Sequence, residues 1–182
     1  MSGYCIIATA WGPLGLAWSE VGLLRVQLTD IDGATTKGRL LHKLPEPEEA
    51  DPPDWLAPTT TELQRYFSGK PVAFSAIPLD LEKIAPFHRA VYDQTLLVGF
   101  GHTVTYGELA ARAGQPGAAQ AVGQAMGRNP MPVIIPCHRV LASNNKLGGF
   151  SAPGGQTTKL MLLDLEGVRL GRNNPAQYVF PF

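Results

Sequence analysis

The chain has 182 residues, 45% of them hydrophobic, and its 15 basic and 15 acidic side chains give a net charge of zero. This length allows one ordinary domain or two small ones, and the hydrophobic fraction excludes a disordered chain. Because no apolar run approaches the roughly 20 residues needed to span a bilayer, we expect no membrane segment.

The charges are unevenly distributed along the chain. Residues 1–83 carry 7 Lys and Arg against 11 Asp and Glu, a net of −4, and residues 84–182 carry 8 against 4, a net of +4. Affinity for a polyanion is therefore expected in the second half. The excess is modest, and an ordinary solvated surface is the alternative interpretation.

The chain has two cysteines, Cys5 and Cys137. A secreted protein of this size usually carries more, and the first residues lack the pattern of a signal peptide, so we expect a reducing, cytoplasmic setting. A disulfide between the two is the less favoured alternative. Since no second Cys or His lies at ligand spacing from Cys137, we expect no zinc site. We also expect no cofactor.

The first half predicts strands and one helix. Turn residues separate three β-rich segments, which predicts an antiparallel sheet. A Pro- and Glu-rich stretch, about residues 30–58, is expected to be an irregular loop. The helix should have threonines as candidate caps at its start. The predicted strands are 4–10, 16–19, 23–28 and 77–81, and the helix is 59–68.

The second half predicts mainly helices. The first starts at Pro86 and stops before Gly99, and the next has a capping-box pattern formed by Thr105 and Glu108. An apolar, extended run at 131–135 leads to Pro136-Cys137. The other predicted helices are 106–112, 117–127 and 158–166. The fold class is therefore α+β, with a structural domain at 1–83 and a helical domain at 84–182.

The helices 106–112 and 117–127 are joined by a tight turn containing Gly114, which predicts a helix-turn-helix. Its second helix carries small side chains and few long donors before Arg128, so it would approach a groove closely but recognise few base edges. That suits a protein that slides along any DNA sequence. The alternative is a plain helical hairpin that packs the core.

Cys137 is followed directly by His138. A cysteine needs thiolate character to react, and a neighbouring base or positive charge can supply it. Adjacent side chains on an extended strand point to opposite faces, so we expect His138 to act through a water, with Glu166 as the carboxylate that orients the imidazole. The alternative is an inert, buried cysteine.

Several ordered blocks in residues 84–170 resemble the O6-alkylguanine-DNA alkyltransferases. They are Pro86-Phe87-His88-Arg89-Ala90-Val91-Tyr92, Thr105-Tyr106-Gly107-Glu108-Leu109-Ala110, Ala121-Val122-Gly123-Gln124-Ala125-Met126-Gly127-Arg128-Asn129-Pro130, Ile135-Pro136-Cys137-His138-Arg139-Val140, Gly148-Gly149-Phe150-Ser151 and Lys159-Leu160-Met161-Leu162-Leu163-Asp164-Leu165-Glu166-Gly167.

The resemblance implies repair of guanine alkylated on O6, after the base is flipped out of double-stranded DNA. By similarity, Cys137 accepts the alkyl group, His138 draws off the thiol proton through a water, and Glu166 orients the histidine. Tyr106 donates to the leaving purine, and Asn129 braces the turn. The second helix would enter the minor groove, and the expected contacts to DNA or base are Ala119, Gln120, Gly123, Arg128, Arg139, Phe150 and Ser151.

Two departures from the family pattern concern DNA binding. The family usually has an arginine where this chain has Gln120, and glutamine lacks the charge and the planar fork. The loop around Ser151 is longer than the commonest form, which affects the assignment of Ser151.

Because a thioether has no carbonyl for water to attack, each molecule should act once. We expect a monomer. Three alternatives are a non-enzymatic protein that binds lesions, a helix-turn-helix regulator that senses alkylation, and a thiol hydrolase. Known lesion-binding relatives lack the acceptor cysteine, which is present here. A regulator would need base-reading side chains on its second helix, which are scarce, and a hydrolase would turn over repeatedly.

Overall fold

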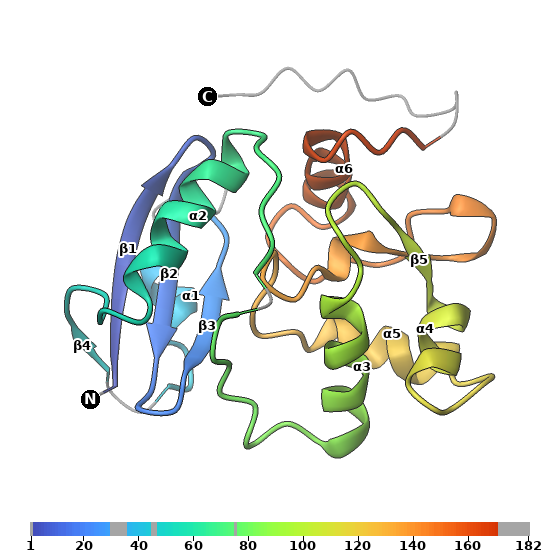
Figure 1. The fold of residues 1–182 in the computed structure, drawn as a ribbon, viewed down its shortest axis with the longest axis horizontal. Coiled ribbons are helices and arrows are strands. Elements are labelled where there is room, and N and C mark those ends of the chain that lie inside the picture. The colour runs from blue at the N-terminus through green and yellow to red at the C-terminus, as the bar shows by residue number, and fades with distance from the viewer. Residues whose placement is uncertain (1, 30–35, 45–46, 75, 171–182) are drawn as a thin grey trace.

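The computed structural model describes residues 2–29, 36–44, 47–74 and 76–170. A sheet with two helices forms one half of the molecule, and the remaining helices form the other (Figure 1). The α+β expectation is confirmed. Among the described residues, no helix combines the length and the apolar character needed to span a membrane.

The sheet has the strand order β3-β2-β1-β4. Strands β1 (Gly3–Thr9), β2 (Gly12–Trp18) and β3 (Leu23–Gln27) are antiparallel, as predicted, and β4 (Glu48–Glu49) pairs with β1 in parallel. Side chains alternate between the two faces: Tyr4 and Ala17 pack with Leu40 of α1 (Thr36–Leu41), whereas Cys5 and Leu16 belong to the main core.

Helix α2 (Ala57–Phe67) lies in front of the sheet in Figure 1 and contributes Leu63 and Tyr66 to the main core. It begins earlier than predicted, and its N-cap is Leu56, whose side chain accepts no hydrogen bond. The expected threonine caps are therefore wrong. Pro58 in the first turn suits the helix start instead, because its φ is fixed and its missing N–H is not needed there.

Two other expectations for this half are corrected. Residues 30–58 are not one loop, since α1 and β4 lie within them; residues 30–35 and 45–46 fall outside the described part. A six-residue helix with Leu40 as its apolar anchor is too short to show a period in the sequence. Residues 77–81 form no strand, and Leu79 makes a single parallel bridge to Leu23.

The helical half contains α3 (Pro86–Leu96), α4 (Tyr106–Arg112), α5 (Ala119–Gly127) and α6 (Gln156–Leu165). The capping box of α4 is confirmed: Thr105 Oγ1 accepts from Glu108 N (3.2 Å), and Glu108 Oε2 accepts from Thr105 N (2.8 Å). Helix α5 starts at Ala119 rather than residue 117, because Gly117 has φ +89° and belongs to the preceding turn.

A short parallel pair supports the centre of this half. Strand β5 (Val104–Thr105), just before α4, pairs with β6 (Val140–Leu141), just after Cys137. Neither strand was predicted, since two residues carry no period. The pair holds the start of α4 beside the segment that carries the cysteine, and the largest core cluster extends from the sheet to this point.

Candidate active site

Asn129, directly after α5, closes the turn that leads to Cys137. Its Nδ2 donates to the Ile135 carbonyl (2.8 Å), and its Oδ1 accepts from Met131 N (2.9 Å). Val133 has a positive φ of 76°. The predicted extended run at 131–135 is therefore wrong: side-chain hydrogen bonds from Asn129 fold it into a turn.

Residues Cys137–Arg139 form one turn of 3₁₀ helix. Cys137 N donates to the Ile135 carbonyl (2.7 Å), and Arg139 N donates to the Pro136 carbonyl (2.9 Å). The expectation of an extended strand is corrected here. With three residues per turn, successive side chains diverge by about a third of a turn. All three residues are buried, but Cys137 lines a cleft that His138 and Arg139 do not reach.

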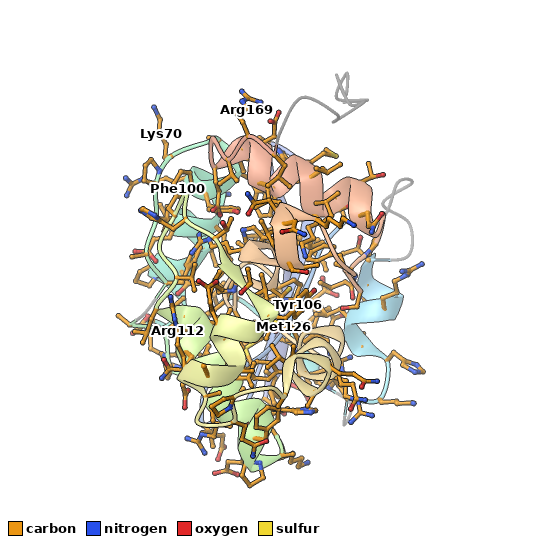
Figure 2. The ribbon with its side chains drawn as sticks, turned by 90° about the vertical axis from the view of Figure 1, so that its right-hand side faces the viewer. Lys70, Phe100, Tyr106, Arg112, Met126 and Arg169 are labelled. Carbon is orange, nitrogen blue, oxygen red and sulfur yellow. The ribbon has the colours of Figure 1, made fainter. Side chains whose placement is uncertain are left out.

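Cys137 lies at a cleft of about 720 Å³ between α4, α5 and the segment before α6. Tyr106 of α4 and Met126 of α5 line it and lie together in the middle of the face shown in Figure 2. The predicted site residues on its wall are Tyr106, Ala119, Gln120, Gly123, Cys137, Phe150 and Ser151. This volume is within the range of small-molecule pockets.

The Cys137 thiol is 4% exposed, and both cysteines are free. Burial raises the pKa of Cys137, and the raising outweighs the opposing effects of the Asn129 side chain and the Lys159 charge. The resting sulfur is therefore a thiol, and a base must remove its proton before it can attack an electrophile.

His138 and Glu166 form a buried pair, with Nε2 2.7 Å from Glu166 Oε1. Burial tends to raise the pKa of Glu166, but the hydrogen bonds and charges of His138 and Arg139 lower it to about 2. Burial lowers the pKa of His138 despite the carboxylate. The ionised carboxylate can only accept, so Nε2 carries the proton of the neutral imidazole. Nδ1 is buried and has no hydrogen-bond partner among the described residues.

Arg139 is also bound to Glu166. Its Nε and Nη2 donate to the carboxylate at 2.9 Å each, Nη1 donates to the Val98 carbonyl (2.5 Å), and the residue is 5% exposed. The expectation that Arg139 contacts DNA is corrected, because its guanidinium is used inside the protein. Gly101 N donates to Glu166 Oε2 (3.1 Å) as well, so the carboxylate is held from several directions.

Two further residues at the site were not predicted. Lys159 is fully buried on α6, where Nζ donates to the Val140 carbonyl (2.6 Å) and lies 5.7 Å from the centre of the Tyr106 ring. Burial lowers the pKa of Lys159 to about 8. Lys159 shares one helix face with Leu162, Leu163 and Glu166, and this spacing could have predicted that Lys159 faces the core. The other residue is Tyr66 of α2, whose hydroxyl donates to Glu166 Oε1 (2.7 Å).

Arg128 lies apart from the thiol. It is exposed at the end of α5 and lines a second cleft of about 480 Å³ together with Arg25, Arg39 and His42. Within the described residues no group of three or more His, Cys, Asp or Glu side chains could hold a metal ion.

The sequence matches two parts of one family. Residues 3–81 match "6-O-methylguanine DNA methyltransferase, ribonuclease-like domain", and residues 86–168 match "6-O-methylguanine DNA methyltransferase, DNA binding domain".

Curated relatives called methylated-DNA–protein-cysteine methyltransferase are similar over most of the chain. The protein of Cricetulus griseus is 36% identical and covers 91% of this chain and 82% of its own. The protein of Methanosarcina acetivorans is 34% identical, with coverages of 90% and 97%. That of Mycobacterium tuberculosis is 38% identical, with coverages of 93% and 94%.

Solved structures share the fold. The structure of Mycobacterium tuberculosis OGT in complex with DNA has a TM-score of 0.70 and 33% identity, and covers 90% of this chain and 92% of its own. The O6-methylguanine-DNA methyltransferase of Pyrococcus kodakaraensis has a TM-score of 0.71 and 25% identity, with coverages of 91% and 99%.

Proposed function

The chain belongs to the family of methylated-DNA–protein-cysteine methyltransferases, the O6-alkylguanine-DNA alkyltransferases, and we propose that Cys137 is the cysteine that takes the alkyl group. The protein repairs DNA by direct reversal, moving the alkyl group from guanine O6 to itself. The observation that carries the assignment is that Cys137 lines the cleft while His138, the next residue in the sequence, is buried and paired with Glu166.

The proton transfers follow from the charges at the site. His138 is neutral and keeps its proton on Nε2, so Nδ1 can accept the thiol proton through a bridging water. The sulfur then attacks the alkyl carbon, a C–S bond forms, and the C–O6 bond breaks with its electrons passing to the purine. Glu166 stabilises the imidazolium that results.

The leaving purine needs a proton, and Tyr106 is positioned on the cleft wall to give one. Burial, together with the nearby sulfur, raises the pKa of Tyr106, so its hydroxyl stays protonated at neutral pH. The products are guanine and an S-alkyl cysteine, and the proton held by His138 returns through solvent to the Tyr106 phenolate. A thioether offers water no electrophilic carbonyl, so we expect a single turnover.

For DNA binding, we propose that α4 and α5 act as a helix-turn-helix with α5 in the minor groove. Ala119 and Gly123 leave room for close approach, and a Cβ added at Gly123 would meet nothing within 4 Å. Gln120 would occupy the gap left by the flipped base, with Phe150 and Ser151 closing over the base and Arg128 near a phosphate.

We also propose that residues 84–182 form the DNA-binding and acceptor domain, that residues 1–83 form a supporting domain, and that the protein acts as a monomer. The matches to 3–81 and 86–168 support this division. Since Cys137 must stay reduced to react, a reducing intracellular setting suits the chemistry.

The experiment uses a limiting amount of duplex oligonucleotide that carries O6-methylguanine. Intact mass and peptide mapping should locate one methyl group on Cys137 of the wild type. Cys137→Ala should gain none, and Cys5→Ala, the matched control, should behave as the wild type. Binding to the duplex without a gain in mass would contradict the proposal.

A further inference from the structure

The hydroxyl of Tyr66 reaches the proposed proton relay from the other half of the molecule. Tyr66 lies on α2, 72 residues from His138 and 100 residues from Glu166 in the sequence. Its hydroxyl is 2.7 Å from Glu166 Oε1 and 3.2 Å from His138 Nε2, and the residue is fully buried. One phenol oxygen therefore touches both members of the pair.

The ring of Tyr66 is fixed by other aromatic rings. Its centroid lies 5.3 Å from Phe67, 5.9 Å from Phe74 and 6.0 Å from Phe100, with edge-on geometry in each case. The His138 ring lies at 6.4 Å, also edge-on. Such packing leaves the hydroxyl little freedom, so its position is set before any substrate arrives.

The direction of each hydrogen bond can be assigned. Burial and the Glu166 charge raise the pKa of Tyr66 well above its usual value, so the hydroxyl keeps its proton. An ionised carboxylate only accepts, which means that Tyr66 donates to Glu166 Oε1. The lone pairs of the phenol oxygen are then available to His138 Nε2. In the opposite tautomer the lone pair of His138 Nε2 would face the oxygens of Glu166 and Tyr66 with no proton between them, which is unfavourable.

We infer that Tyr66 is a positioning residue for alkyl transfer, whose hydroxyl holds Glu166 and His138 so that the imidazole keeps its proton on Nε2 and its free lone pair on Nδ1. This inference rests on the proposed function. It gives the N-terminal half a part in the chemistry, beyond the supporting role expected for it.

Removing the hydroxyl should make the pair easier to protonate. Glu166 would lose a short hydrogen bond to its charged form, which raises the pKa of the carboxyl and makes it a stronger acceptor for His138. Losing the contact between the phenol oxygen and His138 Nε2 should instead lower the pKa of His138. This contact, at 3.2 Å, is longer than the 2.7 Å hydrogen bond to Glu166, so its effect should be smaller. The net effect should be an acid limb of the alkylation rate that moves to higher pH.

Three other titratable or charged groups face the pair. They are Cys137 and Arg139 from the 3₁₀ turn and Lys159 from α6. Burial raises the pKa of Cys137 and lowers that of Lys159 to about 8, so both groups titrate above the acid limb, because burial lowers the pKa of His138 below its usual value. The acid limb therefore reports on the Glu166–His138 pair itself.

The test measures the single-turnover rate of methyl transfer from an O6-methylguanine duplex to the full-length protein, at saturating protein, between about pH 5 and about pH 8. Tyr66→Phe keeps the ring and removes the oxygen. Tyr4→Phe is the matched control, because Tyr4 is also buried and also donates to a carboxylate, Glu49 Oε2, at 2.6 Å. Affinity for the duplex is measured in parallel.

We expect Tyr66→Phe to lower the maximal rate about tenfold and to move the acid limb up by roughly one pH unit, with duplex affinity changed less than about twofold. Tyr4→Phe should match the wild type. A Tyr66→Phe variant with wild-type rate and limb overturns the inference. If Tyr66→Phe loses both rate and duplex affinity while the acid limb stays at the same pH, the role of Tyr66 is purely structural, and the inference is overturned as well.

A second variant decides the matter if Tyr66→Phe fails to fold. Fluorotyrosine at position 66 keeps the hydroxyl and makes it a stronger donor, so the acid limb should move to lower pH; an unmoved limb overturns the inference. If the wild type transfers no methyl group at all, the proposed function fails and this inference fails with it.

Discussion

Glu166→Gln should destabilise the protein because it leaves Arg139 as a buried, unpaired cation. The carboxylate accepts from Arg139 Nε (2.9 Å) and Nη2 (2.9 Å), and both residues are 5% exposed. Glutamine has nearly the same shape, so the cavity is unchanged. The substitution removes the negative charge and places an amide N–H group against the N–H groups of Arg139.

Two arguments give the size of the effect. Breaking one partner of a buried ion pair costs about 3–5 kcal/mol. The fall in the pKa of Glu166 from 4.5 to about 2 corresponds to about 3 kcal/mol of folding free energy. Because the pKa is lower in the folded state, this contribution is complete above pH 4.5 and is lost as the pH falls toward 2.

The assay is urea unfolding of wild type and Glu166→Gln at about pH 7 and about pH 3. We expect the variant to be less stable by about 3 kcal/mol at neutral pH, with the difference shrinking in acid. Glu49→Gln is the control, because Glu49 pairs with Lys37 in solvent and should lose much less. A neutral-pH difference below about 1 kcal/mol, or one independent of pH, would show that the Glu166 charge does not stabilise buried Arg139.

Three further changes test the DNA contact, the turn and the start of α4. Gln120→Arg should tighten binding to a lesion duplex about fivefold by adding a charged donor, and unchanged or weaker affinity in a titration at fixed salt would contradict this. Asn129→Ala removes both side-chain hydrogen bonds that close the turn before Cys137, so the free energy of unfolding should fall by about 2–3 kcal/mol and alkylation should slow. An unchanged alkylation rate would show that this turn does not affect the reaction of Cys137. Thr105→Ala should cost about 1 kcal/mol of stability through the lost cap, and Thr105→Ser should restore most of it.

Features decided by neighbouring residues could be predicted from the sequence. The start of α4 is one, since Thr105 and Glu108 satisfy each other's backbone groups within four residues. The three antiparallel strands are another, because their alternation and turns are local. The acceptor, the histidine and the carboxylate came from the family resemblance, and the structure brings His138 and Glu166 into contact.

Features decided by distant residues could not be predicted. The 3₁₀ turn at Cys137 was also not predicted, although Asn129 is near in the sequence, because the side-chain hydrogen bonds that fold the chain before it leave no hydrophobic period. Arg139 was expected to contact DNA, and its actual partner Glu166 lies 27 residues away in the sequence. Tyr66 had no signal at all, because its partners lie in the other half of the sequence.

Methyl transfer in an excess of O6-methylguanine duplex shows whether Cys137 accepts one methyl group and no more. The number of methyl groups per protein is followed by mass until it stops rising. We expect a plateau at one methyl group, located on Cys137, with an equal amount of guanine restored in the DNA. Continued repair beyond one lesion per protein, or a methyl group on another residue, would contradict it.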